Sequence, residues 1–290
     1  MINKGIILAG GIGSRLFPTT ISVNKQLLML YDKPVIYYPI SILMLAGIRH
    51  ILIIVNKGQT QNFKNVLKDG SQWGLKIDFA EQDKPNGIPE AFIIGEKFIK
   101  HDNIALILGD NFFYGQSLGQ ILKKKISEFK SGSYIFLKQV KNPEQFGVAV
   151  IKENKLKKII EKPKKFVSNL AITGLYLFDN KVINLSKKLK VSKRGETEIT
   201  DLIKIYKNKK LLNFIQLGLG SVWSDTGTIN DMHQVSNYIS TIDKMQNFKI
   251  ACLEEIALYQ KWVSKKFLQK NLRSNEKSDY NMYLKKIISK

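Results

Sequence analysis

Short apolar runs alternate with longer helix-like stretches between residues 4 and 108. Four of the runs are rich in β-branched residues and predict strands: "KGIILA" at 4–9, "HILIIV" at 50–55, "LKIDFA" at 75–80 and "IALIL" at 104–108. Helices are expected between them at 33–47, 60–70 and 89–100. This alternation predicts an α/β fold with a mixed, mainly parallel central sheet flanked by helices. Ligands bind such sheets beyond the carboxyl ends of the strands.

The helix expected at 33–47 has several boundary signals. Asp32 is a candidate cap, Pro34 lies near the start and Gly47 follows the end. Pro39 is expected to kink the helix because a proline removes a backbone donor.

The pattern changes after Asp110. Further strands are predicted within 133–218, and from Thr228 onward the chain is largely helical. In the stretch 254–272, four apolar residues fall on one face of a single predicted helix: Ile256, Tyr259, Val263 and Phe267. We therefore expect a core over 1–227 and a C-terminal helical region over 228–290, both within one compact domain.

Composition indicates a folded protein that is neither secreted nor embedded in a membrane. At 44% hydrophobic residues, a chain of 290 residues can bury a sizeable core. One cysteine excludes an intramolecular disulfide and favours a reducing compartment. The longest apolar run, 34–48, contains two prolines and is shorter than the ~20 residues of a membrane span. A cytoplasmic protein is expected.

The net charge of +22 raises the possibility of a nucleic-acid partner. However, the lysines are spread along the whole chain, which is more typical of a solvated surface. We expect no nucleic-acid partner, although the positive field would favour small anionic substrates.

A glycine-rich turn follows the first predicted strand in "LAGGIGSRLFPTT", residues 8–20. Glycine backbone can approach a phosphate closely, and Arg15 adds a guanidinium that grips phosphate oxygens. Arg15 is one of only four arginines in a chain with 46 lysines and arginines, and Lys25 follows ten residues later. The motif lacks the Gly-Lys-Ser/Thr of a Walker loop, and no carboxylate ends the second strand as a dinucleotide site would require. A phosphate site is favoured over a simple tight turn.

Two carboxylates are candidate metal ligands. Asp110 follows the buried strand "IALIL", and Asp225 lies in the glycine-flanked turn "GSVWSDTGT". Together they could hold Mg²⁺, which prefers oxygen ligands and keeps substrate phosphates in its shell. The alternative is that each aspartate only caps a turn. The three histidines lie far apart and give no zinc spacing.

These motifs together resemble those of the bacterial glucose-1-phosphate thymidylyltransferases. The resemblance runs through "YDKPVIYYPIS", "LILGDNFFYG", "IIEKP", "RGETEITDL" and "VWSDTGT" and covers nearly the whole chain. It implies a Rossmann-like nucleotidyltransferase fold and Mg²⁺-dependent transfer from dTTP to glucose 1-phosphate. The products would be dTDP-glucose and pyrophosphate, in the first step of dTDP-rhamnose-type sugar biosynthesis.

The resemblance also implies roles for individual residues. Arg15 and Lys25 would be catalytic, and Asp110 and Asp225 would bind Mg²⁺. The nucleotide would contact Leu8, Gly10, Gly11, Gly13, Ser14, Arg15, Gln82 and Gly87. The sugar phosphate would contact Phe146, Gly147, Glu161, Lys162, Thr173 and Arg194. A homotetramer is implied as well, with a feedback site near Tyr114, Gly115 and the segment 249–257.

Some positions depart from the family pattern. The usual Gly-Leu-Ala-Gln-Ala is Gly87-Ile88-Pro89-Glu90-Ala91 in this chain, Asn24 replaces a serine and Ser224 replaces a leucine. The amide of Gln82 matches the edge that thymine and uracil share, so UTP or another sugar 1-phosphate remains an alternative substrate. A non-catalytic nucleotide-binding protein is a further alternative.

Overall fold

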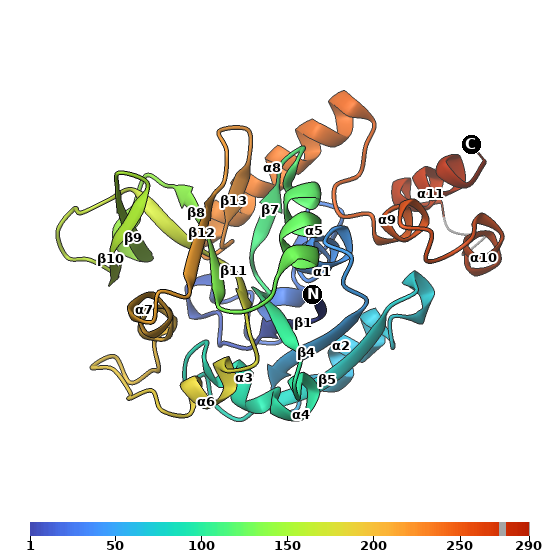
Figure 1. Cartoon of the computed structure of the whole chain (residues 1–290). Helices are drawn as coiled ribbons and strands as arrows, with labels where there is room; N and C mark the ends of the chain where they lie inside the picture. Colours follow the sequence, from blue (N-terminus) through green and yellow to red (C-terminus); the bar gives the residue numbers. More distant parts are fainter. Residues whose placement is uncertain (273–276, 290) are drawn as a thin grey trace.

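A mixed nine-stranded sheet forms the centre of the molecule (Figure 1). The computed structural model describes residues 1–272 and 277–289. The main strand order is β10-β9-β11-β6-β1-β4-β5, and β8 joins β11 and carries β12. The strands of this sheet are β1 (Ile2–Ala9), β4 (His50–Asn56), β5 (Lys76–Gln82), β6 (Asn103–Leu108), β8 (Ser133–Gln139), β9 (Gly147–Lys152), β10 (Lys155–Glu161), β11 (Leu170–Phe178) and β12 (Leu212–Gln216).

The centre of the sheet is parallel. Ile6 on β1 pairs with Leu52 on β4 and with Leu106 on β6, and β5 continues the parallel set beside β4. These are the four strands that the apolar runs predict, so this part of the expected α/β fold is confirmed. Because parallel strands end at one edge of a sheet, the residues after β1, β4, β5 and β6 come together there.

The remaining strands extend the sheet mainly through antiparallel pairs, except that β12 pairs with β8 in the parallel sense. The nine-residue strand β11 lies antiparallel to β6 and also pairs with β8 and β9. Two short ribbons stand apart from the main sheet. They are β2 (Met29–Leu30) with β3 (Lys33–Pro34), and β7 (Phe112–Tyr114) with β13 (Val222–Ser224).

Helices cover both faces of the sheet, and successive residues of the central strands point into two different cores. Ile7 belongs to the core beneath α1 (Tyr37–Leu45), α2 (Thr60–Leu67), α5 (Leu118–Glu128) and α9 (Leu253–Tyr259). Ile6 belongs to the core beneath α3 (Glu90–Ile94), α6 (Val182–Ser186) and α7 (Ile199–Asn208). Burial on both faces explains why these strands are almost continuously apolar.

The first predicted helix is shorter than expected, and its expected cap is wrong. Helix α1 begins at Tyr37, and Asp32 instead contacts the buried ammonium groups of Lys33 and Lys249. Pro39 is the third residue of α1, where a helical N–H has no intrahelical acceptor. Pro39 therefore removes no hydrogen bond from α1, and the reason given for a kink does not apply at this position.

Two other predicted helices are each divided in the structure. The stretch 89–100 forms α3 and α4 (Glu96–Ile99), with Gly95 between them. The stretch 254–272 forms α9 and α10 (Lys265–Asn271), so its four apolar residues do not share one face. Tyr259 ends α9 and is 77% exposed. The single amphipathic helix expected there is wrong.

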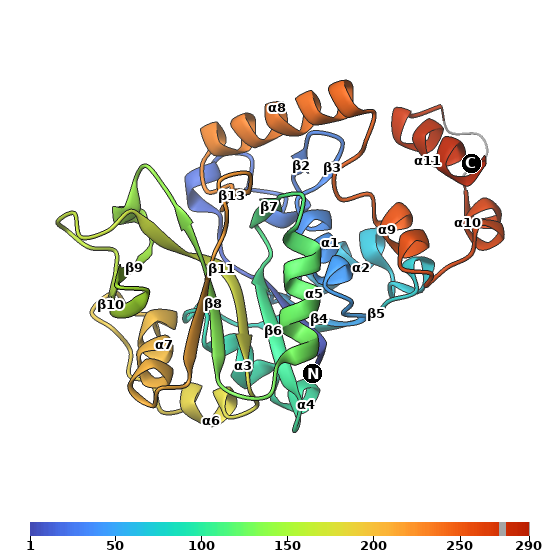
Figure 2. The same cartoon turned by 45° about the horizontal axis from the view of Figure 1, so that its top comes forward.

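In the described part of the chain after Thr228, the regular elements are helices, as the sequence predicts. Helix α8 (Ile229–Gln246) runs along the ribbon of β7 and β13, and α9, α10 and α11 (Asp279–Ser289) lie at the end of the molecule away from β9 and β10 (Figure 2). The expected division at 227/228 stays a prediction. Among residues 1–272 and 277–289, no helix has the length and apolar character to cross a membrane.

Candidate active site

The glycine-rich turn, residues 10–13, follows β1 directly and is called the glycine loop below. It is held by Asn56, the last residue of β4. The Gly11 N–H donates to Asn56 Oδ1 over 3.0 Å, and Asn56 Nδ2 donates to the Gly11 carbonyl over 2.8 Å. Gly11 and Gly13 have φ values of 100° and 64°, which strain a residue with a side chain. The loop is thus a fixed turn between strand β1 and the short helix Ser14–Leu16.

Two glutamines pack against Gly10. A Cβ at Gly10 would lie 2.3 Å from Gln82 Oε1, and the Gln82 side chain is buried at the end of β5. On another side, Gln26 Nε2 donates to the Gly10 carbonyl over 3.3 Å. The main chain of Leu8 accepts a hydrogen bond from Gly109 over 2.8 Å, which brings the loop beside the end of β6. The expected nucleotide residues around this loop are therefore close to one another.

Lys25 is a buried cation that joins the two candidate metal ligands. Its ammonium lies 2.7 Å from Asp110 Oδ2 and donates to the Asp225 carbonyl over 3.1 Å. Asn24 caps the short helix that begins at Lys25, because its side chain accepts from the Gln26 N–H over 3.0 Å. Asn24, which stands where the family pattern has serine, therefore acts as a helix cap.

Asp110 and Asp225 reach the same place from opposite strands of the ribbon that β7 and β13 form. The Thr226 hydroxyl donates to the Asp110 carbonyl over 2.7 Å. Ser224, another departure from the pattern, accepts from the Thr226 N–H and shapes the turn that carries Asp225. Arg15 Nη2 lies 3.7 Å from Asp225 Oδ2, so each candidate catalytic cation lies beside one of the two carboxylates: Lys25 beside Asp110 and Arg15 beside Asp225.

The two carboxylates together favour a cation. Burial, and secondly the charge of Asp110, raise the pKa of Asp225, although Lys25 and Arg15 act in the opposite direction. Carboxylate oxygens that oppose each other's ionisation suit a divalent cation. This donor set fits Mg²⁺, with water and phosphate oxygens completing the shell.

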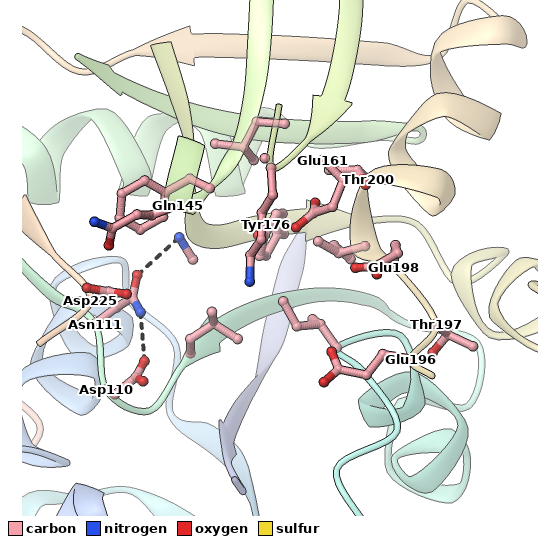
Figure 3. Close-up of a pocket in the computed structure, with 18 of the residues that line it drawn as sticks. Asp110, Asn111, Gln145, Glu161, Tyr176, Glu196, Thr197, Glu198, Thr200 and Asp225 are labelled. Carbon is pink, nitrogen blue, oxygen red and sulfur yellow. Dashed lines mark hydrogen bonds between the residues drawn. The ribbon is translucent and has the colours of Figure 1, made fainter. Parts of the chain in front are cut away.

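A cavity of about 200 Å³ opens beside these aspartates (Figure 3). Asp110, Asn111 and Asp225 lie at one end in Figure 3, and Glu161 and Glu198 lie at the other. Five residues expected to bind the sugar phosphate line this cavity: Phe146, Gly147, Glu161, Lys162 and Arg194.

Charge at the far end of the cavity is predominantly acidic. Burial, and then the charge of Glu198, raise the pKa of Glu161. Arg194 Nη1 lies 3.4 Å from Glu161 Oε1 and 3.4 Å from both carboxylate oxygens of Glu198. The guanidinium therefore sits at the cavity wall between two carboxylates.

The structure does not bring Thr173 to the cavity. Side chains alternate along β11, so its neighbours Ile172 and Gly174 line the cavity. The Thr173 hydroxyl is buried on the opposite face and donates to the Phe136 carbonyl over 2.9 Å.

Sequence reasoning did not identify Asn111 as a site residue, although it lies beside Asp110. Its Nδ2 donates to Asp110 Oδ1 over 2.8 Å, and its Oδ1 accepts from Trp223 Nε1 over 2.7 Å and from the Gly174 N–H over 3.1 Å. A polar residue directly after a strand-end aspartate was the available signal. Asn56, Glu198 and Trp223 were also missed, because only the fold brings them to the site.

A second, larger cavity lies on another side of the ribbon. Its volume is about 760 Å³, and it is lined by Tyr114 and Gly115, by α8 and by residues of the segment 246–260. The residues implied for a feedback site by the resemblance therefore border one cavity.

Comparison with known proteins gives matches over almost the whole chain. A family model described as nucleotidyl transferase matches residues 4–241. Curated glucose-1-phosphate thymidylyltransferases of Neisseria meningitidis, Xanthomonas campestris and Mycobacterium tuberculosis are 48%, 45% and 41% identical to the chain. These alignments cover 99%, 97% and 99% of the chain and 100%, 95% and 99% of the relatives.

Solved structures share the same fold. A Bacillus anthracis crystal structure with sucrose, of a protein assigned to the same enzyme class, matches with a TM-score of 0.75 at 37% identity. This match covers 81% of the chain and 94% of that protein. UDP-glucose pyrophosphorylase with UDP-glucose matches with a TM-score of 0.73 at 24% identity, over 83% of the chain and 99% of that protein.

Proposed function

The chain belongs to the nucleotidyl transferase family and, within it, to the glucose-1-phosphate thymidylyltransferases, and we propose that the site described above carries out this transfer. The reaction joins dTTP and glucose 1-phosphate to give dTDP-glucose and pyrophosphate. The observation that best supports the site assignment is the convergence of Arg15, Lys25, Asp110 and Asp225 at the carboxyl edge of the parallel strands.

In this proposal, the glycine loop and Arg15 hold the triphosphate of dTTP. The loop offers backbone at Gly11 and Gly13, and the Arg15 side chain is 58% exposed and free to turn toward phosphate oxygens. Gln82 and Gly87 lie on the base side of the loop. Fixed donors and charges of this kind lower the barrier without a covalent intermediate.

The sugar phosphate lies in the 200 Å³ cavity. A phosphate oxygen of glucose 1-phosphate attacks the α-phosphorus of dTTP, a new P–O bond forms, and the bond to the β-phosphate breaks to release pyrophosphate. Lys162 and Arg194 neutralise the attacking phosphate, and Glu161 accepts hydrogen bonds from sugar hydroxyls. Lys25 neutralises charge that develops on the α-phosphate.

Asp110 and Asp225 would hold Mg²⁺. When bound, the ion polarises phosphate oxygens and neutralises charge on the triphosphate. Asn111 keeps the Asp110 carboxylate oriented through its 2.8 Å hydrogen bond, and Thr226 holds the main chain of the same residue.

Pyrophosphate release tests the reaction and the site together. With Mg²⁺ and glucose 1-phosphate, we expect release with dTTP, and a competition between dTTP and UTP decides the alternative nucleotide. Asp110→Asn should lower kcat by roughly a hundredfold or more, since a charged group in a preorganised phosphoryl-transfer site is lost.

Asp102→Asn is a matched control for this variant. Asp102 precedes β6, Asp110 follows it, and Asp102 is half exposed and pairs with Lys4. Its variant should keep wild-type activity. Release that is undiminished in Asp110→Asn would contradict the metal assignment, and no release with any nucleotide would contradict the proposed reaction.

We also propose a homotetramer that works in the cytoplasm. The family resemblance supports the tetramer, and a single cysteine supports a reducing compartment. Light scattering coupled to size-exclusion chromatography measures the assembly directly, and a monomeric mass would contradict it.

A further inference from the structure

Glu90 contacts the amide of Gln82 at the end of the parallel sheet. Glu90 Oε2 accepts from Gln82 Nε2 over 2.5 Å, which is the shortest of its contacts. The same carboxylate accepts from the Asn86 N–H over 3.3 Å and from Asn86 Nδ2 over 2.9 Å. Glu90 therefore binds Gln82 while it is held by Asn86.

The loop that carries these residues is anchored from outside. The Asn86 carbonyl accepts from the Thr197 N–H over 2.8 Å and from its hydroxyl over 2.9 Å. Gly87 has a φ of 112°, and a Cβ there would lie 2.0 Å from the Thr197 carbonyl oxygen. Because Thr197 belongs to the segment that lines the sugar cavity, the position of Glu90 is fixed by the wall of that cavity.

An ionised carboxylate can only accept hydrogen bonds, so its partner must present a donor. The Gln82 amide therefore has its NH₂ toward Glu90, and the reversed amide would place two acceptor oxygens against each other. A glutamine at position 90 would permit either orientation, because its own amide both donates and accepts.

This orientation determines what Gln82 offers to a base. One Nε2 proton is used by Glu90, and the other lies beside Oε1, which packs against Gly10 of the glycine loop. The remaining edge is one acceptor next to one donor. It matches the adjacent N3–H and carbonyl of thymine or uracil, whereas cytosine presents the reverse order and would need the amide turned over.

We propose that Glu90 is a positioning residue that selects nucleotides with an imide base edge over dCTP by locking the Gln82 amide. The proposal rests on the proposed function, since it places the base of the nucleotide beside Gln82. It assigns a role to a residue that stands where the family resemblance implies glutamine. The discrimination comes from the unpaired polar groups that the wrong base would bury against a fixed amide.

The test compares kcat/KM for dTTP and for dCTP, with pyrophosphate release as the signal. The wild-type enzyme should favour dTTP by at least ~100-fold, because a buried hydrogen-bonding site rejects a mismatched partner strongly. Glu90→Gln should lower this ratio at least tenfold, chiefly by raising kcat/KM for dCTP. The kcat with dTTP should stay within threefold of wild type, which separates base selection from loss of structure.

Glu81→Gln is the matched control. Glu81 precedes Gln82 on β5, but its carboxylate accepts from the Thr60 hydroxyl instead of the Gln82 amide. This variant should keep the wild-type ratio. An unchanged ratio in Glu90→Gln, or equal use of dTTP and dCTP by the wild type, would overturn the proposal.

Failure of the proposed function has a different signature. In that case the wild type releases no pyrophosphate with any nucleotide, and calorimetric binding of dTTP and dCTP to the same proteins takes the place of the kinetic ratio. Equal affinity of the wild type for both nucleotides, or an unchanged preference in Glu90→Gln, would then overturn the role of Glu90.

Discussion

At the scale of single residues, the site balances two cations against two carboxylates within a few ångströms. Lys25 contacts Asp110, and Arg15 lies near Asp225. Lys25 is buried and pre-positioned, while Arg15 is largely exposed. In the proposed reaction, the buried charge of Lys25 suits transition-state stabilisation, and the exposed charge of Arg15 suits capture of the nucleotide.

Gly10→Ala tests the close packing at the glycine loop. The new methyl group would meet Gln82 Oε1 at 2.3 Å and Asn56 Oδ1 at 3.3 Å, so the base-side amide must move. We expect kcat/KM for dTTP to fall by about 10²-fold, as is typical when positioning groups shift by an ångström. Gly218→Ala is the control, since a Cβ there meets no atom within 4 Å. Equal activity of both variants would contradict this packing argument.

Asp225→Asn separates the chemical role of this residue from its cost to stability. The pKa of Asp225 is higher in the folded chain than in the unfolded chain. Above this raised pKa, the ionised carboxylate therefore lowers the free energy of unfolding, and below the ordinary carboxyl pKa it has no such effect. The isosteric amide removes this cost and keeps an acceptor for the Gly227 N–H. Activity should fall roughly 10²-fold or more, while stability at neutral pH stays equal or rises.

Denaturant unfolding across a pH series measures this effect. Wild-type stability relative to Asp225→Asn should increase as pH falls from the raised pKa to the ordinary carboxyl range, and the difference should then level off. A variant that is markedly less stable at neutral pH would contradict the direction of the pKa shift.

At the scale of elements, the sequence predicts the parallel strands well because their residues are buried on both faces. Such strands are short and rich in apolar, β-branched residues, because side chains on both faces must be buried. Helix boundaries are harder to predict where tertiary contacts compete with local signals. Asp32 pairs with buried lysines and does not cap a helix, and the stretch 254–272 is interrupted by a turn between α9 and α10.

The candidate site shows the same contrast between residues that the local sequence places and residues that tertiary contacts place. Residues on the glycine loop and at strand ends could be placed from the sequence, because parallel strands converge at one edge. Thr173 illustrates the limit: a shift of one residue along a strand exchanges the cavity face for the opposite face. Asn111 and Glu198 act through contacts that only the folded chain creates.

Thr228→Ala tests the cap at the start of α8. Thr228 and Asp231 form a reciprocal capping box at this helix start, three residues after Asp225. Loss of the cap should reduce the free energy of unfolding by about 1 kcal/mol. Thr241→Ala, later in the same helix, is the control because its exposed hydroxyl donates back to the Asn237 carbonyl and lies away from the helix start. Equal stability of the two variants would contradict the cap.

At the scale of the whole molecule, the last described helix is joined to α9 through partly buried polar contacts. Tyr280 and Tyr283 of α11 donate to Glu254 and Glu255 of α9, each over 2.6 Å. Cys252 is buried beneath them, next to the second cavity. The described C-terminal helices therefore complete the core around the single thiol.

The reactivity of Cys252 measures this docking. Burial, and secondly the charge of Glu254, raise its pKa, so the reactive thiolate is rare in the folded protein. A coloured disulfide reagent should modify the native thiol at least ~100-fold more slowly than the thiol of the chain unfolded in guanidinium. Rapid modification of the native protein would show that α11 does not stay docked.

The ribbon of β7 and β13 has a consequence for how the protein is made. Val222 pairs with Tyr114, and Ser224 pairs with Phe112, so residues more than a hundred positions apart must meet before the two aspartates can face each other. Closing so long a loop is slow and depends on the packing that precedes it. On the ribosome, the glycine loop and Asp110 emerge long before Asp225. A growing chain therefore lacks the second of the two candidate metal ligands until more than three quarters of the 290 residues have been joined.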